Sequence, residues 1–333
     1  MDPKLKRIIE TINSRRKHDF TWERGQPVPQ PYYTWHDGQW KARSSGAEQS
    51  ASTTQDGFFS IMSWNIDFMR SFTNERMEKA LSFLEQYISQ ISRPNIIMLN
   101  EMLVSDLRLI QGQSWVREKY RLTDLSEDFW ESGYYGTCVL ISKSTSIAKV
   151  FRVHYEHTAM ERDGLFIDMT INSKTVRICC THLESLVADP PLRPKQLAAA
   201  ARFMHEADAS ILGGDLNAIQ PFDKYLHTDN DLKDAYLETG GKEDAEAGMT
   251  WGQMAPTKER EKFGLSRMDK LMFCGIVAIE RFETFGMDIV LDDGLVAKQL
   301  VEEDGLEKPW VTDHLGVRGD FHVVTDQHAV SKL

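Results

Sequence analysis

The sequence has 333 residues, of which 41% are hydrophobic and 27% are charged, and its formal net charge is −11. This length allows one large domain or two modest ones, and no apolar run is long enough to span a bilayer. The acidic balance argues against a broad, non-specific grip on nucleic acid, because such binding depends on many Lys and Arg contacts to phosphate. It leaves open a small phosphorylated ligand, or a nucleic-acid end held in a local basic patch.

The first 56 residues differ from the rest of the chain. Residues 1–50 contain nine Lys and Arg against six Asp and Glu, so the acidity lies elsewhere. Three prolines between residues 27 and 31 exclude a helix through that stretch. Five aromatic residues are too many for a plain flexible linker: Trp22, Tyr32, Tyr33, Trp35 and Trp40. We expect residues 1–56 to form an aromatic, proline-containing arm packed across a main domain, ending in a loose polar connector at 41–56.

From residue 57 to residue 333, strand and helix patterns alternate along one expected domain. Helical spacing of apolar residues predicts helices over 77–91, closed by Pro94, and over 191–207. Apolar runs predict strands at 58–64, 95–100, 136–142, 165–171, 175–182, 209–214, 267–273 and 315–324. The alternation favours a single α/β domain with layered sheets and outer helices.

Acids, carboxamides and histidines stand at or near the ends of these strands. They are Asn65 and Asp67, Glu101, His182, Asp215 and Asn217, Asp269, and the pair Asp313 and His314. A buried strand positions its end rigidly, as a catalytic group requires. Because unpaired polar groups beside a core are costly, their repetition indicates a functional site.

Each of these residues also has a structural role open to it when it is taken alone. An Asp-x-Asn sequence after a strand is usually a turn or a helix cap. A lone histidine is more often a hydrogen-bonded core residue than a catalyst, and Asp269 beside Lys270 would make an ordinary surface pair. These structural roles do not account for the whole set occurring in this order at strand ends.

The residue types favour metal-assisted hydrolysis of a phosphoester. Glu101 and a neighbouring carboxylate can hold a hard divalent ion such as Mg²⁺, which polarises a phosphoryl oxygen. Asp215 can orient or deprotonate a water, while Asn217, His182 and His314 can donate hydrogen bonds to the phosphorus centre. Asp269 could fix the His314 ring in its protonated form. The sequence has no Cys/His zinc pattern, Walker loop or Gly-x-Ser-x-Gly elbow.

Six short motifs then carry a resemblance to a known family. In order, SWNID, LNEM, THLES, GGDLNA, SRMDKLMF and TDHLGV resemble the motif series of the endonuclease/exonuclease/phosphatase superfamily over roughly residues 58–324. Within it, WNID, THLES, the MTW stretch and DHLGV look most like the 5′-tyrosyl-DNA phosphodiesterases. The resemblance implies a four-layer α/β sandwich, with two packed, mostly antiparallel β-sheets flanked by helices. It also implies Mg²⁺- or Mn²⁺-dependent hydrolysis of a phosphodiester, with a nucleic-acid 5′ end as the best candidate substrate.

The resemblance also implies roles for the first four site residues. Glu101 matches the metal-binding glutamate. Asp67 matches the acid of the first motif, which often reaches the metal through water. Asp215 and Asn217 match the pair that positions the attacking water.

The remaining matches concern the phosphate. His314 matches the phosphate-stabilising histidine, with Asp313 beside it and Asp269 as its expected partner. Asn65 and His182 match residues that flank the scissile phosphate.

Two weaker matches and two departures complete the comparison with the motifs. Ser185 would touch a phosphate oxygen, although a role as a loop serine fits it equally well, and Trp251 would line the substrate groove or belong to the core. Asn100 stands where the family has glutamine before the metal glutamate. Ile219 stands where the tyrosyl-DNA enzymes have an arginine, and loss of that cation weakens the case for a DNA phosphate at this point. The alternatives are therefore an enzyme for RNA, a nucleotide or another small phosphoester, and a binding module without catalysis.

Several features bear on the compartment. The N-terminus lacks an apolar h-region, so no secretory signal is expected. The cysteines do not form paired CxxC motifs and are expected to be reduced structural thiols: Cys138, Cys179, Cys180 and Cys274. The terminal Ser331, Lys332 and Leu333 match the peroxisomal address, which an import receptor reads. An accidental ending, and a location in the nucleus or cytoplasm, is the alternative. No membrane partner is expected, and the oligomeric state is left open.

Overall fold

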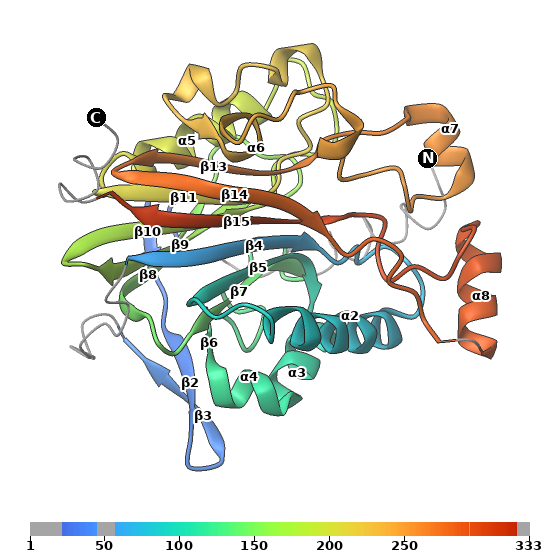
Figure 1. Cartoon of the computed structure of the whole chain (residues 1–333), viewed down its shortest axis with the longest axis horizontal. Helices are drawn as coiled ribbons and strands as arrows, with labels where there is room; N and C mark the ends of the chain where they lie inside the picture. Colours follow the sequence, from blue (N-terminus) through green and yellow to red (C-terminus); the bar gives the residue numbers. More distant parts are fainter. Residues whose placement is uncertain (1–21, 45–56, 293, 325–333) are drawn as a thin grey trace.

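Two β-sheets pack face to face between outer helices in the computed structural model, which describes residues 22–44, 57–292 and 294–324 (Figure 1). This arrangement confirms the predicted α/β sandwich. Two strand pairs are parallel, β4 with β5 and β10 with β11, and the other pairs are antiparallel. Both parallel pairs matter for the site, because parallel neighbours deliver their carboxyl ends to the same edge of a sheet.

The seven-stranded sheet, called sheet A here, has the order β1-β8-β9-β10-β11-β13-β12. Its strands are β1 (Pro27–Pro29), β8 (Ser146–His154), β9 (Asp163–Ile171), β10 (Lys174–Thr181), β11 (Ala209–Asp215), β13 (Asp269–Gly275) and β12 (Lys233–Asp234). On its outer side lie α5 (Arg193–Met204) and the short α6 (Ala235–Glu238).

The eight-stranded sheet, called sheet B here, has the order β14-β15-β4-β5-β7-β6-β2-β3. Its strands are β14 (Val277–Phe285), β15 (Gly316–Val323), β4 (Phe58–Asn65), β5 (Asn95–Leu103), β7 (Tyr135–Ser142), β6 (Tyr120–Leu122), β2 (Tyr32–His36) and β3 (Gln39–Arg43). Outside it lie α2 (Thr73–Ile88), α3 (Val104–Gly112) and α4 (Ser114–Lys119). Two further helices, α7 (Thr257–Phe263) and α8 (Leu295–Asp304), lie toward the end to which β4 points (Figure 1).

The alternation of side chains along the central strands builds two cores at once. On β4, Phe59 and Ile61 face sheet A, while Met62 and Trp64 pack against the helices outside sheet B. Successive side chains of a strand point to opposite faces, so a strand covered on both sides is apolar throughout. For this reason β4, β5 and β11 appear in the sequence as mostly apolar runs, and their ends are held firmly.

All eight predicted strands are present, with ends within three residues of those expected, and both predicted helices form as α2 and α5. Sequence reasoning missed β8 and β14. The strand β14 is half exposed and rich in charged residues. In β8 the charged Arg152 interrupts the apolar pattern from which a buried strand is predicted. It is nevertheless fully buried, because Asp124 and Asp163 pair with its guanidinium at 3.1 and 2.9 Å. The arm also contributes strands, since β1 pairs with β8 and the β2–β3 hairpin pairs with β6.

Some expectations fall outside the described residues. These include the first 21 residues, most of the connector at 41–56, and the terminal tripeptide Ser331–Leu333. The division between arm and main domain at residue 56, and the peroxisomal address, therefore stay predictions. Within the described part of the chain, no helix combines the length and apolar character needed to cross a membrane.

Candidate active site

The carboxyl ends of the two parallel strand pairs meet across the sandwich. In sheet B, Asn65 at the end of β4 is in register with Asn100 on β5. In sheet A, Asp215 at the end of β11 is in register with Asp269 on β13. Asn100 joins the two edges, since its side chain donates to the Thr181 carbonyl oxygen at 3.2 Å and accepts from the Asp215 backbone N–H at 3.3 Å. Asn100 thus links the two sheets.

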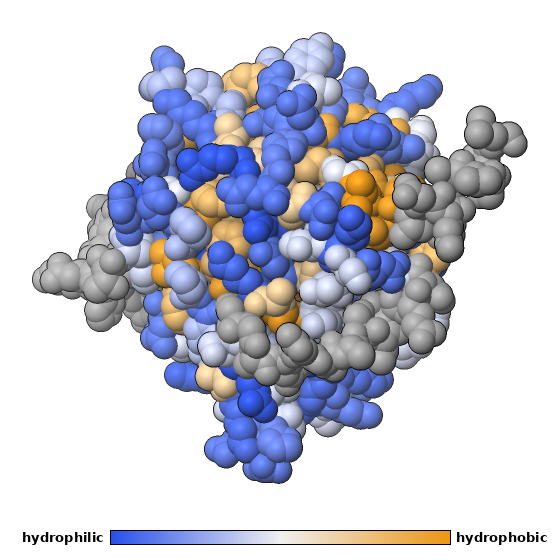
Figure 2. Space-filling view, turned by 90° about the vertical axis from the view of Figure 1, so that its left-hand side faces the viewer, coloured by the Kyte–Doolittle hydropathy of each residue, from blue (hydrophilic) through white to orange (hydrophobic). Residues whose placement is uncertain are grey.

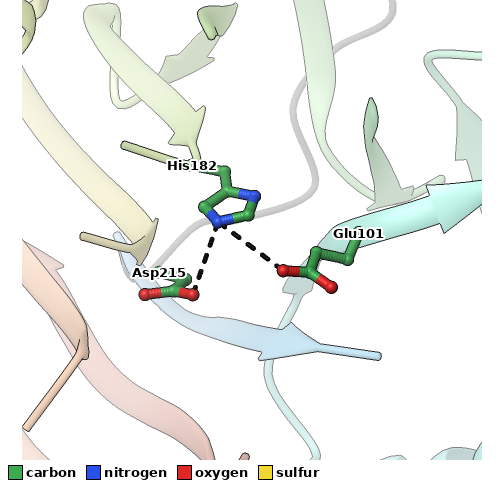
Figure 3. Close-up of side chains that lie close together, drawn as sticks. All are labelled: Glu101, His182 and Asp215. Carbon is green, nitrogen blue, oxygen red and sulfur yellow. Dashed lines mark ion pairs between the residues drawn. The ribbon is translucent and has the colours of Figure 1, made fainter. Parts of the chain in front are cut away.

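Glu101, His182 and Asp215 form a compact cluster at this edge (Figure 3). His182 Nε2 lies 3.7 Å from Glu101 Oε1 and 3.5 Å from Asp215 Oδ2. The ligand-type atoms of all three lie within 4.8 Å of one another. Two carboxylates converging in a largely buried site provide the oxygen ligands that Mg²⁺ and Mn²⁺ prefer.

The charge state of Glu101 supports this fit. Burial, followed by repulsion from the carboxylates of Asp67 and Asp215, raises the pKa of Glu101 to about 8. Nearby His314 and Arg162 only partly offset these effects. A divalent cation would remove the repulsion and hold the carboxylate ionised. The residues present therefore fit a divalent metal ion, although Mg²⁺ and Mn²⁺ are equally compatible with them.

The backbone has unusual conformations at three of the predicted site residues. Glu101, Asp67 and Asn217 have φ angles of 58°, 57° and 48°, in the left-handed region that non-glycine residues rarely occupy. The pairing of β5 with β7 also loses its regular register between Leu99 and Met102, around Glu101. Such conformations cost about 1–3 kcal/mol each and concentrate at functional sites. Three of the ten positive-φ non-glycine residues that the structure describes are thus predicted site residues.

Asp67 lies beside this cluster but is already engaged by cations. Arg70 Nε lies 2.9 Å from Asp67 Oδ2, and the same guanidinium lies 3.0 Å from Glu259 on α7 and 3.5 Å from Asp313. The buried Arg76 donates to the Asp67 carbonyl oxygen at 2.6 Å. Asp67 is therefore held in place by its own ion pair and by Arg76.

Asp215 is held by donors on both of its oxygens. Asn65 Nδ2 donates to Oδ2 at 3.0 Å, and the backbone N–H of Asn217 donates to Oδ1 at 2.9 Å. The Asn217 carboxamide itself donates to the Leu183 carbonyl oxygen at 3.3 Å. Gly214 is required immediately before Asp215, because a Cβ atom there would lie 1.7 Å from the Thr181 carbonyl oxygen. The short GGD sequence thus lets β11 approach β10 closely and fixes the direction of the carboxylate.

His314 faces Asp215 from the other side. Its Nδ1 lies 2.8 Å from Asp269 Oδ2, and its Nε2 lies 3.9 Å from Asp215 Oδ2 and 3.8 Å from Asp313 Oδ1. Although burial acts to lower it, these carboxylates raise the pKa of His314 well above its usual value. Burial raises the pKa of Asp269 to about 6, with His314 opposing that rise. The pair thus favours an imidazolium whose Nε2–H points into the site.

Asp313 accepts a hydrogen bond from Trp251, the residue predicted to line the substrate groove. Trp251 Nε1 donates to Asp313 Oδ2 at 2.8 Å, and Trp251 forms a small buried cluster with Ala255 and Met268. After burial, the charges of His314 and Arg70 dominate and lower the pKa of Asp313. Trp251 is only 8% exposed, so it serves as a wall of the site.

His182 is neutral, in contrast to His314. Arg162 Nη1 donates to His182 Nδ1 at 2.7 Å, which leaves the ring proton on Nε2, the atom facing Glu101 and Asp215. Burial and then the adjacent Arg162 charge lower the pKa of His182 well below its usual value. His182 Nε2 is buried without a hydrogen-bond partner among the described residues. The Nε2–H of His182 can therefore donate to an acceptor on a ligand, such as a phosphoryl oxygen.

Of the predicted site residues, Ser185 alone lies apart from these contacts. Its hydroxyl hydrogen bonds to Met160 Sδ at 3.2 Å. Sequence reasoning missed Arg70, Arg76 and Arg162. Arg70 has a weak signal, the i,i+3 spacing from Asp67, whereas Arg76 and Arg162 have none in the sequence, because their functional neighbours are set by the fold.

A groove of about 300 Å³ adjoins the site beyond Asn217. It is lined by Ala218, Ile219, Gln220, Pro221, Lys224, Glu243, Asp244, Met249, Leu265, Ser266 and Arg267. Three of the segments that line the groove lie within two residues, in the sequence, of Asn217, Trp251 and Asp269. Ile219 is 41% exposed there, while Arg267 is neutralised by Asp234 at 2.8 Å and by Glu243.

Comparisons with known proteins agree with this geometry. The sequence pattern described as the Endonuclease/Exonuclease/phosphatase family matches residues 62–314. "Tyrosyl-DNA phosphodiesterase 2" of Xenopus laevis is 26% identical over 184 residues, which are 53% of this chain and 46% of that protein. The chain therefore matches about half the length of this relative.

Solved structures show the same fold. A D. rerio TDP2 humanized by 14 mutations aligns with a TM-score of 0.62 and 20% identity, covering 80% of this chain and all of that one. D. rerio TDP2 complexed with a single-strand DNA product aligns with a TM-score of 0.59 and 18% identity, with the same coverage.

Proposed function

The chain belongs to the endonuclease/exonuclease/phosphatase family, and from this premise we propose that it is a divalent-metal-dependent phosphodiesterase acting at a nucleic-acid 5′ end. One observation carries the proposal. Side chains from positions 65 to 314 converge on a single pocket, with a candidate metal ligand, a held carboxylate and two histidine donors. Each of these parts is needed to hydrolyse a phosphodiester by attack of water.

The metal ion would be held by Glu101, with Asp67 within reach through water. When bound, such an ion polarises a phosphoryl oxygen and offsets charge that develops on the leaving oxygen. Glu101 is the residue best placed for direct ligation, because its carboxylate lies in the cluster while Asp67 is occupied by Arg70.

Asp215 is the proposed base. Asn65 and the Asn217 backbone hold its two oxygens in one orientation, so the carboxylate can accept a proton from a water placed in line with the scissile bond. No other carboxylate among the described residues lies within reach of both histidines.

The two histidines are proposed to stabilise the phosphorus centre in different ways. The His314 imidazolium, maintained by Asp269, offers a charged N–H where negative charge develops. His182 offers a neutral N–H, because Arg162 occupies its other nitrogen. Donors fixed in a buried site stabilise charge more effectively than water does, because they need not reorient during the reaction.

The choice of a nucleic-acid 5′ end is supported by the relatives. The X. laevis relative is named for tyrosyl-DNA, and the D. rerio TDP2 structure contains single-strand DNA. A 5′-phosphotyrosyl linkage is accordingly the first substrate to test. The X. laevis relative is near 26% identical and only partly covered, so the substrate is proposed separately from the phosphodiesterase chemistry.

A second candidate is a small phosphoester, such as a nucleotide derivative. The groove beyond Asn217 favours it, because Ile219 offers an aliphatic side chain and Arg267 is already paired with acids. A chain of net charge −11 also attracts extended nucleic acid weakly.

The experiment is a hydrolysis assay of the full-length protein with Mg²⁺, with Mn²⁺ and with EDTA. The substrates are a 5′-tyrosyl oligonucleotide and the p-nitrophenyl ester of thymidine 5′-phosphate, which share a phenolic leaving group. Asp215→Asn keeps the side-chain shape and should reduce turnover by at least about a thousandfold without unfolding the protein. Turnover of neither substrate with either metal would instead support a binding module.

A further inference from the structure

A second cavity lies at the opposite end of sheet B from the active site. It has a volume of about 880 Å³ and opens where β4 and β5 begin, beside the end of α2. It is lined by Phe58, Ile88, Ser89, Ile91, Ser92, Arg93, Pro94, Asn95, Lys119, Tyr120, Ser142, Lys143 and Ser144. Figure 2 looks onto the end of the molecule where β4 begins, and hydrophilic residues dominate that face.

The lining has a charge opposite to that of the whole protein. Arg93, Lys119 and Lys143 contribute three cations, and none of the described residues of the lining is an acid. The chain as a whole carries a net charge of −11. The described lining, with three cations and no carboxylate, therefore differs from the acidic balance of the chain, and a concave site focuses the field of such charges.

One of the three cations is paired with an acid outside the cavity and, in the part of the chain that the structure describes, the two lysines are not. Arg93 pairs with Glu280 at 3.2 Å and lies over the Phe58 ring at 5.5 Å. Lys143 Nζ donates to the Arg117 carbonyl oxygen at 2.7 Å. No carboxylate in the described ranges forms an ion pair with Lys119 or Lys143.

The Arg121 guanidinium lies behind Lys143. Its Nη1 donates to the Lys143 and Thr145 carbonyl oxygens at 3.0 and 2.9 Å, so the guanidinium is anchored close by. Burial and then the Arg121 charge lower the pKa of Lys143. An anion bound in the cavity would reverse that effect, since it would stabilise the ammonium form.

We propose that this cavity binds a small organic phosphate of nucleotide size. Lys and Arg side chains beside serine hydroxyls are the donors that phosphate oxygens accept, and the volume lies in the range typical of small-molecule sites. The half-buried Phe58 supplies aromatic surface for the organic part.

The site is separate from the catalytic edge. Asn95 lines the cavity, and Glu101 follows it by six residues along β5. At about 3.3 Å per residue the two are roughly 20 Å apart. Binding there does not depend on the proposed hydrolytic activity and can be measured without it.

Calorimetry on the full-length protein in EDTA tests the proposal, with ADP and inorganic pyrophosphate as separate probes. EDTA keeps divalent metal from drawing phosphate to the catalytic edge. We expect saturable binding of one probe per chain, and a loss of at least about tenfold in affinity in Lys119→Glu, since one charge-assisted contact is worth roughly that factor. Lys119 is exposed and its substitution should leave the fold intact; Lys143→Gln, with a larger loss of affinity, provides the second variant.

Two control variants distinguish binding in this cavity from binding elsewhere on the protein. Lys195→Glu makes the same charge change on α5, on the far side of sheet A, and should leave the affinity unchanged. Asp215→Asn alters the catalytic edge and should also leave it unchanged. No saturable binding at millimolar probe, or an equal loss in Lys195→Glu, would overturn the proposal. A thermal unfolding curve for each variant confirms that a loss of binding is not a loss of fold.

Discussion

His314 Nδ1 lies 2.8 Å from Asp269 Oδ2, and both side chains are almost completely buried. The contact joins the last motif of the chain to the start of β13 and decides the charge of the imidazole. Because the neighbouring carboxylates raise the pKa of His314, the ring stays protonated at neutral pH and beyond. Stability from this charged ring is present below about pH 6.5, the usual unfolded-state pKa of histidine, and is lost as the pH rises through the higher folded-state pKa.

The substitution Asp269→Asn should move the alkaline limb of activity to lower pH. Without the carboxylate, the pKa of His314 falls, so the imidazolium is lost earlier as the pH rises. We expect kcat at pH 8 to drop by about 10- to 100-fold, with a smaller loss near pH 6. A pH–rate profile of wild type and variant measures the shift. His314→Gln is the matched control and should lack this limb altogether; an unshifted profile in Asp269→Asn would show that the pair is only structural.

Metal affinity should increase with pH up to about pH 8. The Glu101 carboxyl, whose pKa is raised to about 8, binds a proton that a metal ion must displace. Between pH 6 and 8 the apparent affinity for Mn²⁺ should rise by up to about tenfold per pH unit and then level off. Calorimetric titration at several pH values measures this. Glu101→Gln should bind Mn²⁺ weakly at every pH, and a wild-type affinity that does not vary with pH would contradict the assignment.

An arginine at position 219 should change the relative rates on long and short substrates. In Ile219→Arg, a guanidinium replaces a 41% exposed aliphatic side chain in the groove beyond Asn217. We expect kcat/KM for the tyrosyl oligonucleotide to rise by about tenfold at low salt, while that for the thymidine ester changes little. Ile219→Leu keeps the groove apolar and should change neither. Equal gains on both substrates would place the added charge at the scissile phosphate instead.

Gly214→Ala should destabilise the protein through a steric clash and not only through backbone strain. The added Cβ would lie 1.7 Å from the Thr181 carbonyl oxygen, at a φ of 151°. We expect a loss of at least about 3 kcal/mol in the free energy of unfolding, measured in urea. Gly38→Ala is the control, because it also has a positive φ, 76°, but no atom within 4 Å, and about 1 kcal/mol is expected there. Similar losses in both variants would argue against the clash.

The sequence predicted those parts of the molecule in which one local pattern determines the structure. Strands β4, β5 and β11 are largely apolar on both faces. β4 and β11 end in Asn65 and Asp215, and β5 carries Glu101 two residues before its end, at positions for which core packing alone gives no reason. Asp215 and Glu101 could therefore be recognised before any coordinates. Arg162 could not be recognised in this way, because its role depends on a contact with His182 that only the fold creates. The strand β8 was hidden for a similar reason, since its buried Arg152 is neutralised by acids from two other segments.

The arm supplies one of the two edge strands of each sheet. Within the described residues, β1 closes one sheet beyond β8, and the β2–β3 hairpin closes the other beyond β6. A shortened chain that starts at Gly57 would retain every group of the pocket. It would leave β8 and β6 as exposed edge strands, with unsatisfied main-chain donors and acceptors. Such edges recruit strands from other molecules, so aggregation would remove this shortened protein from solution even though its chemistry is complete.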